Sequence, residues 1–587
     1  MFKNLKLFYP FIRKYKHLFI GGFLALLIVD LFDVMPQLII KYALDELQLK
    51  GFYPYGYIVE NLLMCAVFYI MIAITQDFFR YFMRRYFHGS GFIISRDLKV
   101  QFYEHIQKLP PSFYNKTKTG DLMSRATADI DSASQFYSGA VFIGLDNFFY
   151  FLTVPFIMFS LSPELMLYAL IPVPILPFFV NRISNLIHKK FKESQEILSK
   201  ISAFSQENFS GVKVIKSFSQ EQNQIMGFAE INKQYVTKNL ELARLNAFFG
   251  PSLQLVISTS VLIVIIVGGK MAIDEKITIG TYAAFQAYLL KIIGPMIGLG
   301  WTMSIYQRAA ASMERLQEIF NVQPAIKDAD DAITDAVLDG DIEFNNVTVM
   351  HEDKCIPSLD NFNLRIKKGT TVAIVGPIGG GKSTILNLLP RFLEPTSGEI
   401  TINGISLNKI ALKTLRGNIG YVQQESFLFS DTISGNIAFG ASNADDKTIQ
   451  KAAEIAMVHK DIRDFPDGYE TMLGERGVNL SGGQRQRITL ARAVIKDPHI
   501  ILLDDCLSSV DSDTEEEILK NLNTYLAHRT CLIVTHRVPA VKIADEIIFM
   551  DDGKIIEHGT HEELLKHNVR YADFYNRQQM ERDLEKL

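Results

Sequence analysis

Six apolar segments lie before residue 310, and they constrain this 587-residue chain more than any other feature of its sequence. Several approach the roughly 20 residues that a helix needs to cross a bilayer. The first follows a basic stretch, but it is too long for the apolar part of a signal peptide and lacks a small-x-small cleavage site. We therefore predict six transmembrane helices, at about residues 18–40, 57–75, 140–161, 165–180, 253–267 and 279–299.

The connections between these segments alternate sharply in length. Residues 160–164 and 268–278 form short turns, whereas residues 80–135 and 181–246 are long, polar and rich in Lys and Arg. The positive-inside bias places the long connections and the N-terminus in the cytoplasm. Both long connections are free enough of breakers to be helical extensions of the membrane helices. Residues 1–320 are thus predicted to form an all-α membrane domain with six transmembrane helices and two intracellular loops.

Five acidic residues lie in or near the predicted membrane helices. Asp30 and Asp33 are three positions apart, on one face of the first helix. Ionisable groups at membrane depth normally face a wet cavity or a partner. Two interpretations stay open: a substrate path that favours cations, or charges that lie at the interface or pair between helices. The other three acids are Glu60, Asp77 and Asp146.

Composition and periodicity change after the last apolar segment. Residues 321–341 are acidic and lose the helical period, which is typical of a linker. Residues 342–587 alternate strand-like and helical runs, the α/β pattern of a mostly parallel sheet. A net charge of −4 argues against nucleic acid as a partner. The four cysteines have no C-x-x-C pair, which favours free thiols over disulfides or a zinc site.

A phosphate-binding loop is predicted at residues 371–384, which read T-V-A-I-V-G-P-I-G-G-G-K-S-T. A β-branched run precedes the spacing G-x-x-x-x-G-K-S, and a stretch without helix breakers follows it. The glycines let backbone N–H groups turn toward a phosphate chain, and the N-terminus of the following helix attracts the same anion. Lys382 would contact the β- and γ-phosphates, and the Ser383 hydroxyl would reach Mg²⁺. The predicted nucleotide-binding residues are Gly376, Pro377, Ile378, Gly379, Gly380, Gly381, Lys382, Ser383 and Thr384.

Further polar residues follow the strand-like runs of this half. Asp504 ends the run at 499–505, where P-loop enzymes hold Mg²⁺, and Asp505 would lie next to the attacking water. Gln424 follows residues 419–422 and would touch both metal and water. His536 follows residues 531–535 and would contact a γ-phosphate. A second glycine-rich, anion-binding turn comprises Ser481, Gly482, Gly483 and Gln484, before a predicted helix at 485–493.

With these motifs in place, nearly the whole chain resembles an ATP-binding cassette (ABC) exporter of the half-transporter type. The most specific piece is L-S-G-G-Q-R-Q-R at residues 480–487, between the phosphate loop and Asp504. The resemblance implies that 376–384 is the Walker A loop, 481–484 the signature and Asp504 the Walker B acid. It also implies a Q-loop at Gln424, a D-loop at 508–511, a switch histidine at His536, an exporter-specific loop at 474–477, and intracellular loops at 119–125 and 207–218 that dock on the cassettes.

Two positions depart from the family pattern. The family has a catalytic glutamate after the Walker B aspartate, where this chain has Asp505. It also has an aromatic residue that stacks on adenine, where this chain has His351. Because the phosphate loop is complete, we predict that the site binds ATP with Mg²⁺. Because both departures touch this site, we predict that it hydrolyses ATP weakly.

The function implied by the resemblance is ATP-driven export of a small amphipathic molecule, drug or lipid by alternating access. The expected location is a bacterial-type inner membrane, with the N-terminus and the ATP-binding domain in the cytoplasm. A chain with one cassette must pair, and the departures favour a heterodimer in which this chain supplies a degenerate site. The expected partners are a second half-transporter, the lipid bilayer and the substrate. The alternatives are a homodimeric exporter with slow hydrolysis and an ATP-gated regulator that does not pump.

Overall fold

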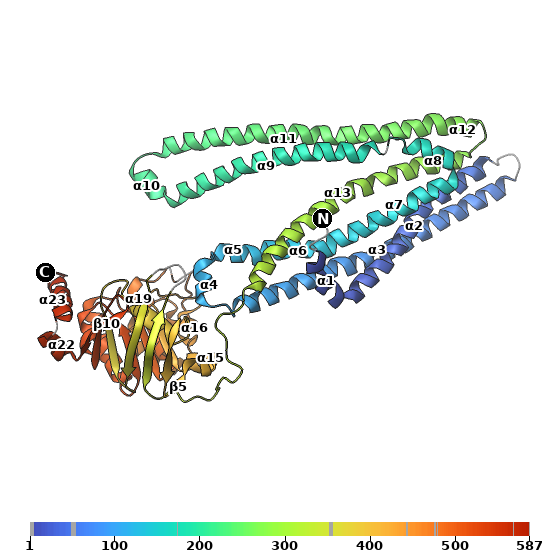
Figure 1. The fold of residues 1–587 in the computed structure, drawn as a ribbon. Coiled ribbons are helices and arrows are strands. Elements are labelled where there is room, and N and C mark those ends of the chain that lie inside the picture. The colour runs from blue at the N-terminus through green and yellow to red at the C-terminus, as the bar shows by residue number, and fades with distance from the viewer. Residues whose placement is uncertain are drawn as a thin grey trace. The chain divides into compact units, whose positions relative to one another are not determined.

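The structure is a computed structural model that describes residues 5–585, apart from 49–53, 173, 351–355, 442–443, 475–476, 478 and 568. The chain divides into two compact units (Figure 1). The first comprises Met1–His105 and Gly120–Asn321, and the second comprises Ile106–Thr119 and Val322–Leu587. Each unit is described by itself.

The first unit is helical. Among the described residues, five helices are long and apolar enough to cross a membrane: Lys16–Gln48, Tyr55–Ile106, Thr119–Leu161, Glu221–Ile273 and Ile279–Asn321. The elements are α1 (Leu5–Lys14), α2 (Lys16–Gln48), α3 (Tyr55–Ile106), α5 (Thr119–Ser124), η1 (Arg125–Asp129), α6 (Ile130–Gln135), η2 (Phe136–Ala140), α7 (Val141–Leu161), α8 (Pro163–Leu170), α9 (Ile175–Ser210), α10 (Val212–Ser217), α11 (Glu221–Ile263), η3 (Val264–Gly268), α12 (Gly269–Ile273) and α13 (Ile279–Asn321). The three η segments are single π-helical turns.

The predicted count of six membrane helices is not confirmed. The segment predicted at 165–180 is divided between α8, which ends at Leu170, and α9, which begins at Ile175. Pro172 and Pro174 lie between them. Proline lacks a backbone N–H and disfavours helical backbone at the residue before it, so this sequence does not sustain one continuous helix. The prediction of one membrane helix at 165–180 followed the apolar pattern and did not take account of the helix break that these two prolines indicate.

The predicted short and long connections are confirmed where the structure describes them. Ser162 reverses the chain between α7 and α8 with an extended backbone, and its Oγ accepts a hydrogen bond from Leu165 N at 3.3 Å. That bond satisfies one of the free N–H groups at the start of α8. The long connection at 181–246 is helical, since it consists of most of α9, all of α10 and part of α11. α9 and α11 lie side by side and are joined through α10 (Figure 1).

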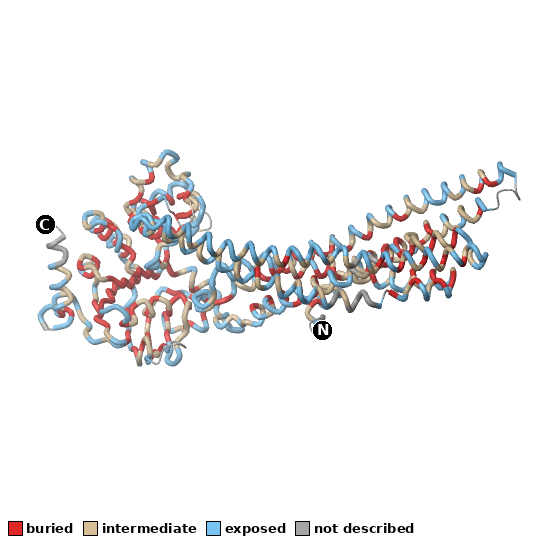
Figure 2. Tube along the Cα trace, turned by 90° about the horizontal axis from the view of Figure 1, so that it is seen from above, coloured by how far each residue is buried: buried red, intermediate tan, exposed pale blue. Residues whose placement is uncertain are grey.

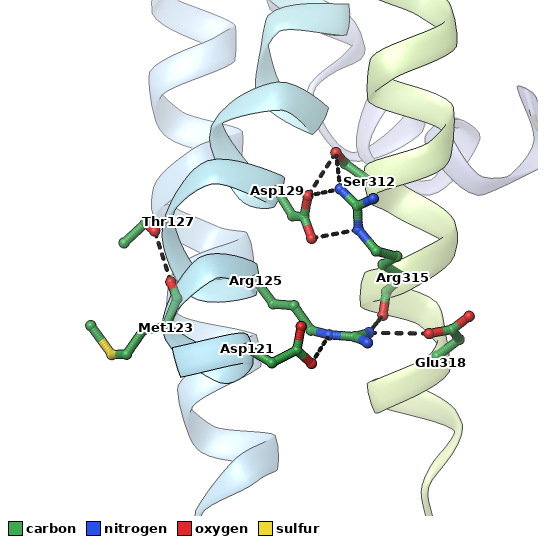
Figure 3. A network of polar contacts seen from close by, with 8 residues as sticks. All are labelled: Asp121, Met123, Arg125, Thr127, Asp129, Ser312, Arg315 and Glu318. Carbon is green, nitrogen blue, oxygen red and sulfur yellow. Dashed lines mark hydrogen bonds and ion pairs between the residues drawn. The ribbon is translucent and has the colours of Figure 1, made fainter. Parts of the chain in front are cut away.

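A polar network holds the η1 turn against α13 (Figure 3). Asp129 is buried and accepts hydrogen bonds from Arg315 Nε at 2.9 Å and Ser312 Oγ at 2.9 Å. Beside it, Arg125 donates to Asp121 at 2.9 Å and pairs with Glu318 at 3.2 Å. A buried carboxylate is tolerated only when it is paired and hydrogen-bonded, and Asp129 meets both conditions. The network therefore fixes the packing of these two segments.

The second unit is built on a six-stranded sheet in the order β10-β9-β3-β8-β7-β6. Every neighbouring pair from β9 to β6 is parallel, and β10 is antiparallel at the edge. All residues of β3, β7 and β8 are buried. Figure 2 shows buried segments, in red, inside this unit. The predicted parallel sheet is confirmed. The strands are β3 (Thr371–Val375), β6 (Ile419–Val422), β7 (Ile500–Asp504), β8 (Thr530–Val534), β9 (Glu546–Asp551) and β10 (Lys554–Gly559).

A second sheet, antiparallel and in the order β2-β1-β4-β5, was not predicted. Its strands are β1 (Ile342–Val349), β2 (Leu359–Ile366), β4 (Ser397–Ile402) and β5 (Ile405–Ser406). β2 alternates buried and exposed residues, as strands do when one face of an antiparallel sheet faces water. The two sheets share one apolar core, in which Phe344 of β1 and Ile374 of β3 are both buried.

Helices cover the sheets of the second unit, and two of them matter for the site. α14 (Lys382–Leu388) follows β3 directly, and α19 (Gly482–Val494) precedes β7. The remaining helices are α4 (Pro111–Lys116), η4 (Leu407–Lys409), α15 (Leu412–Gly417), α16 (Ile433–Ala438), α17 (Asp446–Ile455), α18 (His459–Asp464), η5 (Gly468–Glu470), α20 (Ser512–Leu526), α21 (Val538–Lys542), α22 (His561–His567) and α23 (Val569–Glu585).

Candidate nucleotide-binding site

The parallel sheet brings most of the predicted site residues to one edge. Because β3, β8, β7 and β6 are parallel, their carboxyl ends meet at the same edge of the sheet. Backbone bonds fix neighbouring ends: Thr535 N donates to Ile374 O at 3.3 Å, and Asp505 N donates to Val534 O at 2.8 Å. The phosphate loop follows β3. β8 ends two residues before His536, β7 ends at Asp504 and is followed by Asp505, and β6 ends two residues before Gln424.

The phosphate loop has the backbone that its glycines allow. Gly379 and Gly381 have φ angles of 87° and 90°, which side-chain-bearing residues rarely adopt. Gly381 is the N-cap of α14, so the first N–H groups of that helix open into the loop. Lys382 is 6% exposed, and its Nζ donates to the carbonyl oxygens of Gly376 at 2.8 Å and Pro377 at 2.7 Å. A buried ammonium group therefore lies directly over the loop.

Two oxygen ligands meet at the end of the phosphate loop. Ser383 Oγ donates to Asp504 Oδ1 at 3.0 Å, and Asp504 is 6% exposed. Burial raises the pKa of the Asp504 carboxyl, and the Ser383 hydrogen bond opposes that effect. Mg²⁺ in phosphate-binding enzymes is held by one or two protein oxygens, phosphate oxygens and water. These two residues fit such an ion, whose charge would favour the ionised carboxylate.

Asp505 and His536 both interact electrostatically with the positive charge of Lys382. The positive charge of Lys382 interacts with Asp505, and the carboxylate of Asp505 interacts with His536. Burial, with a further contribution from the Lys382 charge, lowers the pKa of the His536 imidazole. The lowered pKa favours the neutral imidazole near pH 7, in which one ring nitrogen can donate a hydrogen bond and the other can accept one.

Two predicted residues are less closely tied to this group. Gln424 lies in the turn after β6 with an exposed side chain. His351 lies outside the described residues, as do Glu475 and Arg476 of the loop that we predicted at 474–477. Ile378, within the phosphate loop, is 95% exposed. Its side chain points away from the protein, so only its backbone can serve the loop.

The second glycine-rich turn begins α19. Ser481 Oγ accepts from Gln484 N at 3.1 Å, and Gln484 Oε1 accepts from Ser481 N at 3.1 Å, a complete capping box. The predicted helix at 485–493 is confirmed, since α19 runs from Gly482 to Val494. Among the described residues, no hydrogen bond or ion pair joins Ser481, Gly482, Gly483 or Gln484 to the phosphate loop.

Two positioning residues escaped the sequence reasoning. Gln486 is buried, donates to Ser508 Oγ at 2.9 Å and accepts from Ser509 N at 2.9 Å. Arg537 donates to Ser508 O at 2.7 Å and Val510 O at 3.0 Å, and it also pairs with Glu515. Together they hold the segment after Asp505 from two sides. Gln486 lies within the run at 480–487 and Arg537 directly follows His536, and these positions were the only signal available in the sequence.

Comparisons with known proteins agree with this geometry. The family model for the ABC transporter transmembrane region matches residues 18–296, and the model for the ABC transporter itself matches residues 359–508. The probable multidrug resistance ABC transporter ATP-binding/permease protein YheI of Bacillus subtilis is 34% identical over 99% of this chain and 98% of its own. The multidrug resistance-like ATP-binding protein MdlA of Escherichia coli is 33% identical over 97% and 95%.

A solved structure of a bacterial Atm1-family ABC exporter with ATP bound matches the fold with a TM-score of 0.77. It is 25% identical in sequence, and the match covers 97% of this chain and 98% of that one. The chain belongs to the ABC transporter family. It is an integral membrane protein of the half-transporter type, and its cassette is an ATPase coupled to transport.

Alanine substitution at two glycines of the phosphate loop tests how closely the loop packs against neighbouring backbone. A Cβ on Gly381 would lie 2.2 Å from Ser358 O, whereas a Cβ on Gly379 would meet nothing within 4 Å. Both have positive φ, which costs a side-chain-bearing residue about 1–2 kcal/mol. We expect Gly381→Ala to lose at least tenfold in ATP affinity and Gly379→Ala to lose less than Gly381→Ala. Titration of a fluorescent ATP analogue against each full-length variant measures the difference; equal losses would contradict the crowding.

Proposed function

We propose that this chain is one half of an ATP-driven exporter that moves a small amphipathic molecule, drug or lipid by alternating access. The observation that carries the proposal is the joining of a membrane domain to a cassette whose phosphate loop, Asp504, Asp505 and His536 meet at one sheet edge. The relatives named as multidrug resistance proteins support this substrate class. Closure of two cassettes on ATP would bias a two-state membrane domain, and hydrolysis would reset it.

Roles follow for the residues of the site. The loop from Gly376 to Thr384 binds the phosphates, and Ser383, Asp504 and Gln424 hold Mg²⁺. Asp505 polarises the attacking water, with Gln424 and His536 orienting water and γ-phosphate. His351 stacks on the adenine. The proposed domains are the membrane domain at 1–320, the linker at 321–341 and the nucleotide-binding domain at 342–587.

We further propose that the partner is a second, different half-transporter. Support comes from the intact turn formed by Ser481, Gly482, Gly483 and Gln484. In the described part of the chain, this turn makes no hydrogen bond with the chain's own phosphate loop. In a pair of cassettes that turn completes the ATP site of the other chain. Asp505 then makes this chain's own site the slow one, while its signature serves a faster site on the partner.

The proposed location is a bacterial-type inner membrane. The bias of Lys and Arg toward residues 80–135 and 181–246 supports a cytoplasmic position for both connections, for the N-terminus and for the ATP-binding domain.

The presence of Asp505 also favours a second candidate, a membrane protein that ATP gates without pumping. Reconstitution into vesicles with the cassettes outside separates the two. An exporter accumulates an amphipathic dye inside when ATP and Mg²⁺ are supplied, and the dye in turn stimulates ATP hydrolysis. ATP-dependent binding without accumulation would favour the regulator. The matched control replaces ATP with a non-hydrolysable analogue. Because the cycle is then not reset, the dye should not accumulate inside the vesicles.

A further inference from the structure

Two arginines cross between η1 and α13 in opposite directions (Figure 3). Arg315 of α13 donates to the carboxylate of Asp129. Arg125 of η1 donates to the backbone carbonyl of Arg315 and pairs with Glu318. Because each segment supplies a cation to the other, the two segments can separate only by breaking both sets of charge-assisted bonds. We call these contacts the clasp, and its members are Asp121, Arg125, Asp129, Ser312, Arg315 and Glu318.

The clasp is buried at one end. Asp129 is 4% exposed, and both of its carboxylate oxygens accept hydrogen bonds: Oδ1 from Ser312 at 2.9 Å and Oδ2 from Arg315 Nε at 2.9 Å. The carboxylate also ends η1, which is a single π-helical turn. Such turns are rare and occur frequently at functional sites. Exposed ion pairs contribute little, whereas a forked guanidinium on a buried carboxylate fixes one geometry. The buried end therefore sets how η1 lies on α13.

The chain passes between its two units three times, and the clasp adjoins each crossing. The crossings follow His105, Thr119 and Asn321. Asp121 comes two residues after the second crossing, and Glu318 comes three residues before the third. At the first crossing, a ring nitrogen of His105 is hydrogen-bonded to the backbone carbonyl of Ile319 at 2.9 Å. The end of α3 is thus tied to the same turn of α13 as the clasp.

Three segments of the first unit start or stop at these crossings: α3, the segment from α5 to α7, and α13. Any movement of the cassette that the chain itself transmits must enter the first unit through them. Coupling between distant sites is carried by packed side chains and ion-pair networks that join rigid elements. The clasp joins two of the three segments, and the contacts of α3 with the end of α13, which include the rings of Phe102 and Phe320, join the third.

We propose that the clasp couples the cassette to the membrane domain, by making η1 and the end of α13 respond to ATP binding as one body. Asp129 and Arg315 are positioning residues in this role, since both belong to the first unit and the phosphate loop belongs to the second. The proposal concerns the coupling of ATP hydrolysis to transport that family membership establishes. It depends neither on the proposed substrate nor on the choice of partner.

α13 carries its own reporter for the test. Trp301 is the only tryptophan of the chain, is 65% exposed, and lies about four helical turns before Arg315. Its emission responds to the surroundings of the indole, so it changes when α13 moves. The measurement uses the full-length chain as it assembles in lipid nanodiscs, with the tryptophans of any partner chain replaced by phenylalanine. Trp301 emission is recorded without nucleotide and at saturating ATP and Mg²⁺, and ATP binding is measured separately with a fluorescent analogue.

We expect ATP to change the Trp301 emission of the wild type. The double variant Asp129→Asn/Arg315→Gln should still bind ATP and should show less than about half of that change. Replacing both partners leaves no buried charge unpaired, so the fold should be kept. Arg315→Lys keeps the charge but not the forked donors, and its response should lie between the two. The matched control is Arg308→Gln, at an exposed arginine that donates to Ser304 of its own helix, and it should respond as the wild type does.

A full Trp301 response in the double variant would overturn the proposal, and so would an equal loss in Arg308→Gln. A wild type without any response would contradict it as well, because α13 would then not follow ATP binding. If the double variant no longer bound ATP, the clasp would serve folding and not coupling. Each variant is accepted only with a wild-type melting temperature; if the double variant does not fold, Arg315→Lys and Arg125→Gln decide. Because no transported molecule is present, failure of dye export would leave this result standing.

Discussion

Lys382→Ala is expected to abolish ATP binding at this chain's own site. The side chain supplies a buried positive charge over the phosphate loop, where Nζ is held by the carbonyls of Gly376 and Pro377. Burial lowers the pKa of this ammonium group, and the nearby carboxylates of Asp504 and Asp505 oppose that shift. Three or four phosphate charges cannot be balanced by backbone dipoles alone, so we expect a loss of at least 100-fold in affinity.

Titration of a fluorescent ATP analogue against the full-length chain measures this loss. The matched control is Lys368→Ala, which removes an exposed lysine of the same unit that pairs with Asp339. The control should bind ATP as the wild type does. Unchanged affinity in Lys382→Ala, with the fold intact, would contradict the assignment of the loop.

Asp505→Glu is expected to raise ATP hydrolysis at this chain's site by about 10- to 100-fold. A glutamate carboxylate reaches about 1.3–1.5 Å further than an aspartate carboxylate, and a misplacement of about 1 Å can cost on the order of 100-fold in rate. That gain corresponds to at most about 2.7 kcal/mol. The backbone opposes it, since Asp505 has a φ of 44°, a conformation that aspartate tolerates better than glutamate.

The positive φ at this position would offset about 1–2 kcal/mol of the gain in the glutamate variant, so the expected increase in rate begins at about tenfold. Single-turnover hydrolysis by the mixed complex, with the partner's own site disabled, isolates the site in question. Asp505→Asn serves as the second variant. Because we propose that this site is already slow, this change should alter its rate by less than about tenfold. A rate that is unaltered by Asp505→Glu, with ATP still bound, would contradict the proposal that the shorter carboxylate limits hydrolysis at this site.

Much of the cassette could be predicted from local sequence. The strands at 419–422 and near 500–504 are short, mostly apolar runs. Such runs are typical of parallel strands that are buried on both faces. The acids at the end of β7 then lie at the same edge as the phosphate loop because the strands are parallel. The antiparallel sheet was missed because β1 pairs with β2 and β4 through interrupted registers, and because β4 lies about 50 residues after β1, beyond the phosphate loop.

Contacts between distant residues were beyond the sequence. The spacing of Asp30 and Asp33 predicted a shared helix face. Only the fold shows that Gln76, Tyr150 and Lys291 all hydrogen-bond to the Asp33 carboxylate. In the same way, nothing local revealed that Gln486 and Arg537 hold the segment after Asp505. Of the two interpretations that the sequence left open for the membrane acids, the structure confirms pairing between helices at Asp33, and the substrate path stays a prediction.

The most direct test of the central claim compares ATP turnover by this chain alone with turnover by this chain and its candidate partner half-transporter, purified together in lipid. We predict slow turnover by the lone chain and at least tenfold faster turnover by the mixture. In the mixture, Asp505→Asn should cost little. Ser481→Arg should depress hydrolysis strongly, because it would block the signature that we propose completes the partner's site. Rapid turnover by the lone chain that Asp505→Asn leaves unchanged would contradict the asymmetric pair.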